Sequence, residues 1–387
     1  MQNFTYHSPT KIVFGENQIS QLASLLKEQQ VTSLLLVYGK TSIKTNGIYD
    51  EVVRVCKELD IDLIEESGVE PNPDISSVRS GIQKAKENNV DFILAAGGGS
   101  VVDCAKAIAI GAVIEQDIWD VYLLKLVPTK AMSLGVIITL AATGSETNGN
   151  SVISNRAKRE KRTVAYQFCK PAFAIVDPTY TLSVNRHHTI AGSIDIIMHI
   201  FEQYFANTLD TKTSDYMMMG ILNSVIENTN EIINGNDSYQ VRANISWAST
   251  ITLNWILGVD KAGDWATHRM SYSVTKVYNT THGYALAMLF TSWARVVHKY
   301  NPETMERKLK RIGKFVFNET NPLKVLDIID ELFISWGAPN RLKAANYDIT
   351  DETIDDMVNH CLVFGPIGQV IKIDHKIAKE IFIEALK

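Results

Sequence analysis

The feature that most constrains the fold of this 387-residue chain is a change in hydrophobic pattern near its middle. Before Asp177-Pro178, short continuous apolar runs alternate with amphipathic segments of helical length. Such runs are typical of parallel strands buried on both faces, and their alternation with helices predicts a doubly wound, Rossmann-like parallel sheet. The predicted strands are 33–39, 62–67, 91–99, 134–142 and 172–178, and the predicted helices are 17–29, 46–58, 74–88 and 101–113. A hairpin is predicted from NSVISN and RTVAYQF around the charged turn RAKREK.

From about residue 186 onward, nearly every segment has helical periodicity instead. The predicted helices are 186–206, 211–231, 238–257, 283–299, 302–315, 322–335, 351–362 and 374–386. A chain of this length is too long for one ordinary core. We therefore expect an α/β N-terminal domain at 1–183 and an all-α C-terminal domain at 184–387. A site is expected in a cleft between two such unlike domains.

The composition argues against several classes of function. The net charge is −5 with both signs scattered, so there is neither a basic footprint for nucleic acid nor a polybasic membrane patch. The longest apolar run, LGVIITLAA, is far shorter than the roughly 20 residues that span a bilayer. The N-terminal segment lacks the layout of a signal peptide, and the four cysteines are widely spaced. We expect a cytoplasmic protein with reduced thiols.

A glycine cluster follows one predicted strand, in LAAGGGSVVDCAKAIAI. Gly97, Gly98 and Gly99 stand at the strand end, and Ser100 opens the next helix. Glycines let backbone N–H groups approach a phosphate closely, and a helix N-terminus favours negative charge. The spacing is not G-x-G-x-x-G, and a plain strand–helix turn is the alternative. A pyrophosphate site is favoured because Ser100 can cap the helix and Asp103 follows in its first turn.

The first predicted strand ends in LVYGKTSIKTNG, with Gly39, Lys40, Thr41 and Ser42 and no carboxylate. In NAD-selective folds an Asp or Glu at this position holds the ribose 2′-OH. A small, basic, hydroxyl-bearing corner suits a 2′-phosphate, and an ordinary polar loop is the alternative. The pattern therefore favours NADP(H), with NAD(H) possible.

A third strand end, in TLAATGSETNGNS, carries several hydroxyl and amide side chains. The carboxyl ends of strands in such sheets face one crevice. Part of this group can equally form an N-cap and a turn. Its members are Thr139, Thr143, Ser145 and Asn148.

Four residues of the second half have the spacing and chemistry of metal ligands. Asp195 and His199 are four residues apart, which places both on one face of the predicted helix. Such a pair alone is often a hydrogen-bonded core pair, but His268 and His282 can complete a set of one carboxylate and three imidazoles. This set suits Fe²⁺, Zn²⁺, Mn²⁺ or Co²⁺, and four protein ligands with an open position would admit a substrate oxygen.

Motifs along nearly the whole chain resemble those of the iron-containing alcohol dehydrogenase family. They are PTKIVFG, GVEPNPD, GGGSVVDCAKA, TLAATGSETN, AIVDPTYT, DIIMHIFEQY and NTTHG. The segment DWATHRM and the missing acid after LVYG resemble the branch of NADPH-dependent aldehyde reductases and butanol dehydrogenases. The resemblance implies a dehydroquinate synthase-like two-domain fold. It also implies hydride transfer between NADP(H) and small aldehydes or primary alcohols, in a cytoplasmic homodimer.

The resemblance also implies roles for individual residues. Asp195, His199, His268 and His282 would bind the catalytic divalent metal, Fe²⁺ or Zn²⁺. Asp103 stands where the family has an acid near the nicotinamide and substrate. The residues implied to bind the cofactor are Gly39, Lys40, Ser42, Gly97, Gly98, Gly99, Ser100, Val101, Thr139, Leu140, Thr143, Asn148, Lys161 and Tyr180.

The chain departs from the family at three places near these motifs. Tyr272 stands where the family usually has a histidine proposed to move the proton, so we assign the proton-donor role to Tyr272. LSVNRHH replaces the usual Leu-Pro-Pro, and NTTHG replaces Asn-Thr-Pro-His-Gly. The alternative functions are a diol or polyol dehydrogenase of the same fold, a dehydroquinate synthase-like lyase, and a non-enzymatic metal-binding protein.

Overall fold

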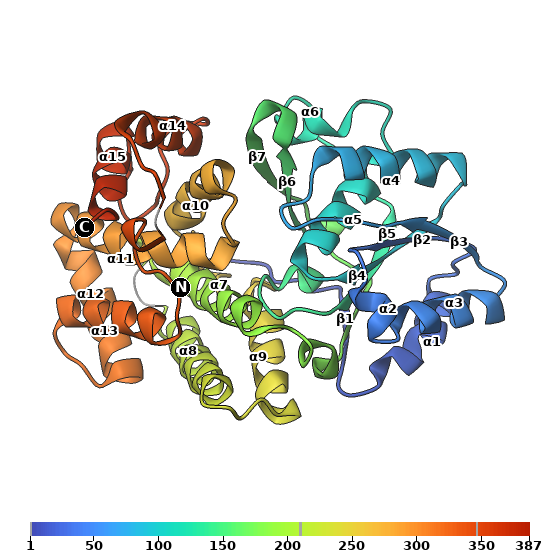
Figure 1. The fold of residues 1–387 in the computed structure, drawn as a ribbon, viewed down its shortest axis with the longest axis horizontal. Helices are drawn as coiled ribbons and strands as arrows, with labels where there is room; N and C mark the ends of the chain where they lie inside the picture. The colour runs from blue at the N-terminus through green and yellow to red at the C-terminus, as the bar shows by residue number, and fades with distance from the viewer. Residues whose placement is uncertain (1, 209–210, 346) are drawn as a thin grey trace. The chain divides into compact units, whose positions relative to one another are not determined.

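The computed structural model describes residues 2–208, 211–345 and 347–387, which form two compact units (Figure 1). The α/β unit comprises His7–Val184 together with Ser238–Asn254. The helical unit comprises residues 2–6, Asn185–Asp237 and Trp255–Lys387.

Helix α9 (Tyr239–Thr252) is part of the α/β unit, although its periodicity had placed it with the helical half. Its side chains explain this. Thr250 Oγ1 donates to Glu146 Oε1 at 2.7 Å, and the Trp247 ring meets Phe14 edge-on at 5.6 Å. Helical periodicity predicts that a helix has a buried face, but it does not say which core that face covers.

The α/β unit contains the predicted parallel sheet, with six strands in the order β1-β8-β5-β4-β2-β3. The strands are β1 (Lys11–Phe14), β2 (Ser33–Tyr38), β3 (Asp62–Glu66), β4 (Phe92–Gly97), β5 (Ser133–Ile138) and β8 (Phe173–Val176). Every pairing in this sheet is parallel, so the carboxyl ends of the strands lie along one edge. Strand β1 was not predicted, because four residues are too short for a clear apolar run.

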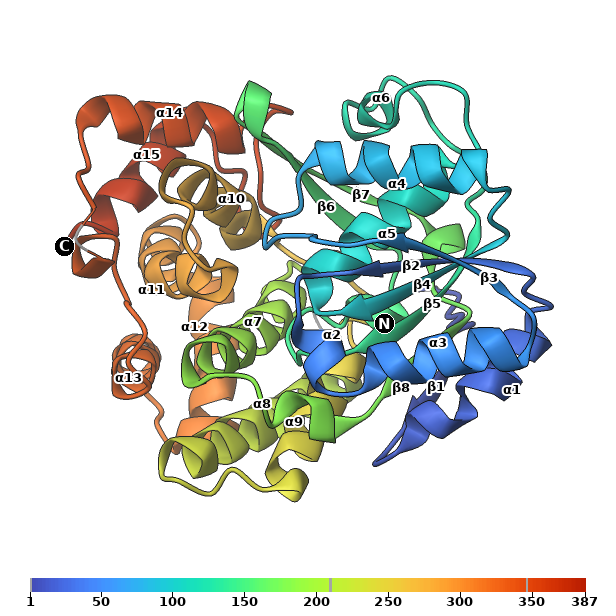
Figure 2. The ribbon, with the colours of Figure 1, turned by 45° about the vertical axis from the view of Figure 1, so that its right-hand side comes forward.

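Helices cover both faces of this sheet (Figure 2). Leu34 and Leu36 of β2 pack into one apolar cluster with helices α1 (Leu22–Glu28) and α3 (Ile48–Glu58). Leu35 and Val37 pack into another with α4 (Ile75–Glu87) and α5 (Gly99–Gly111). The expected burial of both faces is confirmed. Short helices α2 (Ser42–Thr45) and α6 (Ile118–Tyr122) and the antiparallel hairpin of β6 (Asn150–Asn155) and β7 (Glu160–Ala165) complete the unit.

The helical unit contains α7 (Arg186–Tyr204), α8 (Lys212–Ile233), α10 (Ala266–Tyr278), α11 (His282–Tyr300), α12 (Pro302–Ile312), α13 (Pro322–Ser335), α14 (Asp351–Cys361) and α15 (His375–Glu384). Their starts follow local rules. Asn185 caps α7 through His188 N, and an Asn-Pro pair opens both α12 and α13. Helix α10 was not predicted, because its buried face is largely polar and gives no apolar periodicity. Within the described ranges, no helix has both the length and the apolarity needed to cross a bilayer.

Candidate active site: a metal cluster and a cofactor edge

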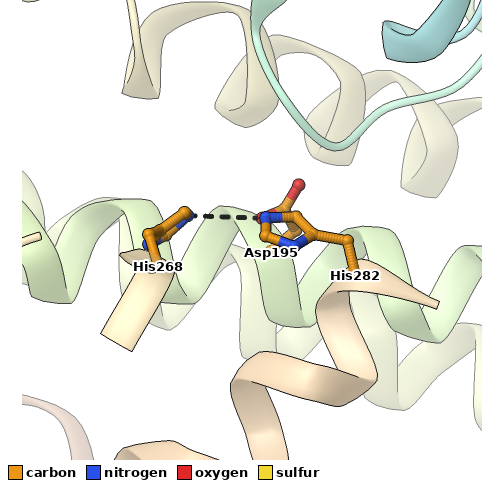
Figure 3. Close-up of side chains that lie close together, drawn as sticks. All are labelled: Asp195, His268 and His282. Carbon is orange, nitrogen blue, oxygen red and sulfur yellow. Dashed lines mark ion pairs between the residues drawn. The ribbon is translucent and has the colours of Figure 1, made fainter. Parts of the chain in front are cut away.

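Three helices of the helical unit bring three of the four predicted metal ligands, Asp195, His268 and His282, close to one another, and the fourth, His199, lies beside Asp195. Asp195 Oδ1 lies 3.7 Å from His199 Nε2, 3.8 Å from His268 Nε2 and 3.6 Å from His282 Nε2. The ligand atoms of Asp195, His268 and His282 all lie within 4.8 Å of one another (Figure 3). Asp195, His199 and His268 are at most 5% exposed, whereas His282 is only partly buried. The cluster is therefore accessible mainly from the side of His282.

Each ligand is placed by a feature of its own helix. Asp195 and His199 are four residues apart on α7, as predicted, whereas His268 lies on α10 and His282 is the first residue of α11. The start of α11 approaches α7 very closely at Gly283, where an added Cβ would lie 2.0 Å from the carbonyl oxygen of Ala191. Because Ala191 is one turn before Asp195, this approach brings His282 to the carboxylate.

The arrangement fits a bound cation better than a hydrogen-bonded cluster. Separations of 3.6 to 3.8 Å are too long for hydrogen bonds. Asp195 Oδ1 and His268 Nε2 are buried, and neither has a hydrogen-bond partner among the residues that the structure describes. A tetrahedral ion about 2.1 Å from its ligands has ligand–ligand edges of about 3.4 Å, close to these values.

The carboxylates and imidazoles of the cluster also shift one another's pKa values. Burial alone would raise the pKa of Asp195, but the facing imidazoles of His199, His282 and His268 outweigh it and lower that pKa. Burial alone would lower the pKa of His268, but the carboxylates of Asp195 and Glu202 raise it to about 9. The site thus stabilises positive charge next to Asp195, as a cation site must.

Aromatic side chains surround the cluster. The Trp265 ring meets the His268 ring edge-on at 5.4 Å, and it precedes α10 with a φ of 59°. This left-handed conformation is strained for a bulky residue, and such strain is often found at functional sites. The Tyr272 ring lies 5.8 Å from the His282 ring at an interplanar angle of 29°. The proposed proton donor is therefore next to a predicted ligand.

In the α/β unit, the glycine cluster forms the turn from β4 into α5. An added Cβ at Gly97 would lie 2.6 Å from Val101 Cγ2, and one at Gly99 would lie 2.6 Å from Thr143 Oγ1. A side chain at Gly97 or Gly99 would therefore force its neighbour to move. The expected cap by Ser100 is not formed, because the helix begins at Gly99 and Gly98 occupies the N-cap. Because Gly98 has no side chain, no side-chain oxygen caps the start of α5. An anion could therefore accept hydrogen bonds from N–H groups of the first turn.

The corner after β2 holds Gly39, Lys40 and Ser42 as predicted, but a carboxylate reaches it from another loop. Gly68 N donates to Gly39 O at 2.9 Å, which brings the GVEPNPD segment alongside. Glu70 Oε1 lies 3.4 Å from Lys40 Nζ, and Glu70 also pairs with Arg156 at 2.9 Å. The loop after β3 therefore places the carboxylate of Glu70 beside the end of β2, which has no acidic residue of its own.

Asp103, in the first turns of α5, belongs to a buried polar network. Ser145 Oγ donates to Asp103 Oδ1 at 3.0 Å, and burial raises the pKa of Asp103 to about 6. Lys106 is fully buried and donates to the carbonyl oxygens of Ser145 at 2.7 Å and Asn150 at 2.9 Å. Asn148 accepts from the same ammonium group at 3.3 Å. The network holds the loop between β5 and β6.

The remaining predicted cofactor residues lie at the same sheet edge or beside it. Thr139 follows β5, and Leu140 lines a small pocket together with Glu146, Asp177 and Thr181. Lys161 Nζ donates to Asn72 Oδ1 at 2.7 Å, and Tyr180 packs against the α1–α3 face.

Buried charged residues of these regions that were not predicted include Glu202 and Lys106. Glu202 accepts from His268 Nδ1 at 2.9 Å, and Lys106 holds the loop described above. Glu202 is seven residues after Asp195, which places it on the same helix face, and this spacing was the available signal. Lys106 stands in an otherwise apolar helix, which was the signal for a buried cation.

Comparisons with known proteins identify the family of this chain. The family model "Iron-containing alcohol dehydrogenase" matches residues 9–178, and "Fe-containing alcohol dehydrogenase family, C-terminal" matches residues 189–385. The chain is 41% identical over 375 residues to "Probable NADH-dependent butanol dehydrogenase 1" of Bacillus subtilis, covering 95% of this chain and 96% of the relative. It is 32% identical to the NADPH-dependent aldehyde reductase YqhD of Escherichia coli, covering 83% and 81%.

The fold likeness is equally extensive. The crystal structure of NADH-dependent butanol dehydrogenase A from Thermotoga maritima matches with a TM-score of 0.94 and 36% identity, covering 100% of this chain and 99% of that one. The chain belongs to the iron-containing alcohol dehydrogenase family. It is a metal-containing oxidoreductase that uses a nicotinamide cofactor, with the expected two-domain fold. The 1,3-propanediol dehydrogenases are more distant, at 27% and 26% identity.

Proposed function

We propose that this protein transfers a hydride between NADP(H) and small aldehydes or primary alcohols, as a butanol dehydrogenase-like enzyme. The observation that carries the proposal is the convergence of Asp195, His268 and His282, joined by His199, around one buried position. The names of the relatives, which include NADH-dependent butanol dehydrogenases and an NADPH-dependent aldehyde reductase, support the substrate class.

The four side chains would hold one divalent ion, Fe²⁺ or Zn²⁺. When bound there, such an ion acts as a Lewis acid toward a carbonyl oxygen. Asp195 contributes a single negative charge and the imidazoles contribute none when neutral, so the loaded site remains net positive toward an oxygen atom. The Trp265 ring packs edge-on against the His268 ring.

The glycine turn would bind the diphosphate of the cofactor. Gly97, Gly98 and Gly99 allow close approach, and the uncapped start of α5 presents N–H groups to an anion. The other proposed contacts are at the ends of β2, β5 and β8, where Lys40, Thr139 and Tyr180 stand.

We assign the proton transfer to Tyr272, whose ring stacks on His282. An ordinary tyrosine pKa near 10 matches this task poorly, and a neighbouring cation would lower that pKa. Substitution Tyr272→Phe removes the hydroxyl and keeps the ring. We expect kcat to fall and the alkaline limb of its pH profile to change. Full turnover with an unchanged profile would remove Tyr272 from the mechanism.

The choice between NADP(H) and NAD(H) depends on Lys40 and Glu70. Lys40 and Ser42 favour a 2′-phosphate, whereas Glu70 and the names of the NADH-dependent relatives favour NAD(H), the second candidate. Because the Lys40 side chain is 73% exposed, Lys40→Ala should raise the KM for NADPH only several-fold, about 1 kcal/mol, and leave the KM for NADH unchanged. Equal effects on both cofactors would contradict the phosphate contact.

The central experiment is an activity screen of propanal to hexanal and of 1,3-propanediol and glycerol, with NADPH against NADH. The protein is first stripped with a chelator and then reloaded with Fe²⁺ or Zn²⁺. We expect reduction of the aldehydes that depends on added metal. Preference for the diols would favour the polyol dehydrogenase alternative, and a clear preference for NADH would overturn the assigned role of Lys40 and Ser42.

We also propose a cytoplasmic homodimer, because the family resemblance implies it. Light scattering of the purified protein during gel filtration measures the assembly directly. A mass near twice 43.2 kDa is expected, and a stable monomer would contradict the proposal.

A further inference from the structure

Glu202 is a buried carboxylate of α7 directed at the backbone and the ring of His268. It is 3% exposed and lies three residues after His199 on the same helix. One oxygen, Oε1, accepts from His268 N at 2.8 Å, from His268 Nδ1 at 2.9 Å and from the Thr267 hydroxyl. A single carboxylate therefore holds both the main chain and the imidazole of a predicted ligand.

These bonds fix the protonation of the ring. An ionised carboxylate only accepts, so Nδ1 carries the hydrogen, and in the neutral ring Nε2 keeps its lone pair. Nε2 is the atom that lies 3.8 Å from Asp195 Oδ1, toward the other ligands. Rotating the ring would break the bond from Nδ1, so the same contact also fixes the orientation of the lone pair.

The support for Glu202 extends behind it. Asp264 N donates to the main-chain oxygen of Glu202 at 2.8 Å. Asp264 Oδ2 in turn accepts from Gln369 N at 2.7 Å and from Val370 N at 2.8 Å. The segment just before α10 is therefore hydrogen-bonded both to α7 and to Gln369 and Val370, which precede α15.

We propose that Glu202 is a positioning residue, which sets the Nδ1–H tautomer and the orientation of His268 and thereby strengthens metal binding. The proposal rests on the proposed metal site. A carboxylate hydrogen-bonded to a ligand imidazole raises its basicity, and loss of such a partner typically lowers metal affinity about 10–100-fold.

Two substitutions separate the parts of this role. Glu202→Gln keeps an accepting oxygen but removes the charge, and Glu202→Ala removes both. Asp330→Asn is the matched control, because Asp330 is another buried carboxylate of the helical unit and accepts from Thr291 at 2.7 Å and from Arg341 at 2.7 Å. Zinc affinity is measured by competition with a chromogenic chelator. We expect a loss of about 10–100-fold for Glu202→Ala, a smaller loss for Glu202→Gln and no change for Asp330→Asn.

A second readout does not require metal or activity. Nitrogen NMR of the metal-free protein, at a pH above the His268 pKa of about 9, identifies the tautomer of the neutral ring, with the signal assigned by its absence in His268→Ala. We expect the Nδ1–H form in the wild type and a mixture of tautomers in Glu202→Gln. An Nε2–H form in the wild type would overturn the proposal even if the alanine variant did not fold.

The outcomes also distinguish this proposal from the metal site itself. If His268→Ala binds zinc as tightly as the wild type, the proposed site is wrong and the role of Glu202 falls with it. If His268→Ala loses zinc but both Glu202 variants retain wild-type affinity, only the inference about Glu202 is overturned.

Discussion

The cofactor edge and the metal cluster are built from different parts of the polypeptide. The residues proposed to bind the cofactor lie at the ends of parallel strands, and most of them follow β2, β4 or β5 within a few positions. The metal cluster consists of side chains from α7, α10 and α11. The cofactor edge therefore depends on local chain geometry, whereas the metal cluster depends on how helices pack.

A glycine serves each region, and the two contacts differ in kind. At Gly283 an added Cβ would meet a main-chain oxygen of α7, which cannot turn aside. At Gly99 it would meet the side chain of Thr143, which can rotate. We therefore expect the metal cluster to tolerate its glycine substitution less well than the cofactor edge does.

Gly283→Ala should have the largest effect. The methyl group must move α11 away from Ala191, which separates His282 from Asp195. We expect metal affinity to fall about 10–100-fold, with a loss of about 1–3 kcal/mol in unfolding free energy. Chelator competition and denaturant titration measure the two effects. Wild-type metal affinity in this variant would contradict the account of how α11 is placed.

Gly99→Ala should act on the other region alone. Thr143 has to rotate, which breaks the hydrogen bond that it accepts from Ser145 N at 3.2 Å. We expect cofactor affinity to fall about tenfold, about 1.4 kcal/mol, with metal affinity unchanged. The control is Gly220→Ala in α8, where nothing lies within 4 Å of an added Cβ; it should raise stability by about 0.5–1 kcal/mol. Loss of metal in Gly99→Ala would show that the two regions are not independent.

Asp103→Asn should produce a smaller effect that depends on pH. Burial raises the pKa of Asp103 from 3.8 to about 6, so the folded protein favours the neutral carboxyl. As pH rises from 4 to 6 the unfolded chain ionises first, and the unfolding free energy of the wild type falls. The asparagine variant lacks this loss. We expect its stability relative to the wild type to increase by about 1 kcal/mol over that range, because partial exposure reduces the full effect.

Urea titrations of both proteins at several pH values between 4 and 7 measure this difference. A constant gap would mean that Asp103 is solvated well enough to keep its ordinary pKa. If the stability difference changed in the opposite direction, the charge of Lys106 would outweigh burial and lower the pKa of Asp103.

The same contrast explains which parts of the structure the sequence predicts. Continuous apolar runs indicate strands that are buried on both faces, and they predicted the parallel sheet correctly. The hairpin of β6 and β7 was also predicted correctly, from two short segments on either side of a charged turn. Asp195 and His199 were recognisable because their spacing is local. The short edge strand β1 and the polar helix α10 left no such pattern.

Contacts between distant segments were beyond the sequence patterns. Nothing in LVYGKTSIKTNG indicates that Glu70 lies beside Lys40, because the contact is made by a loop 30 residues away. The bond from Glu202 to His268 joins residues 66 positions apart. Helix α9 carries a correct periodicity but packs in the α/β unit, because tertiary contacts such as Thr250 with Glu146 decide its place.

Anomalous diffraction from a crystal of the protein loaded with Zn²⁺ or Fe²⁺ tests the central claim most directly. We predict one strong peak, about 2.0–2.2 Å from a carboxylate oxygen of Asp195 and from the Nε2 atoms of His199, His268 and His282. A peak at any other place, with these four side chains left without an ion, would contradict the account.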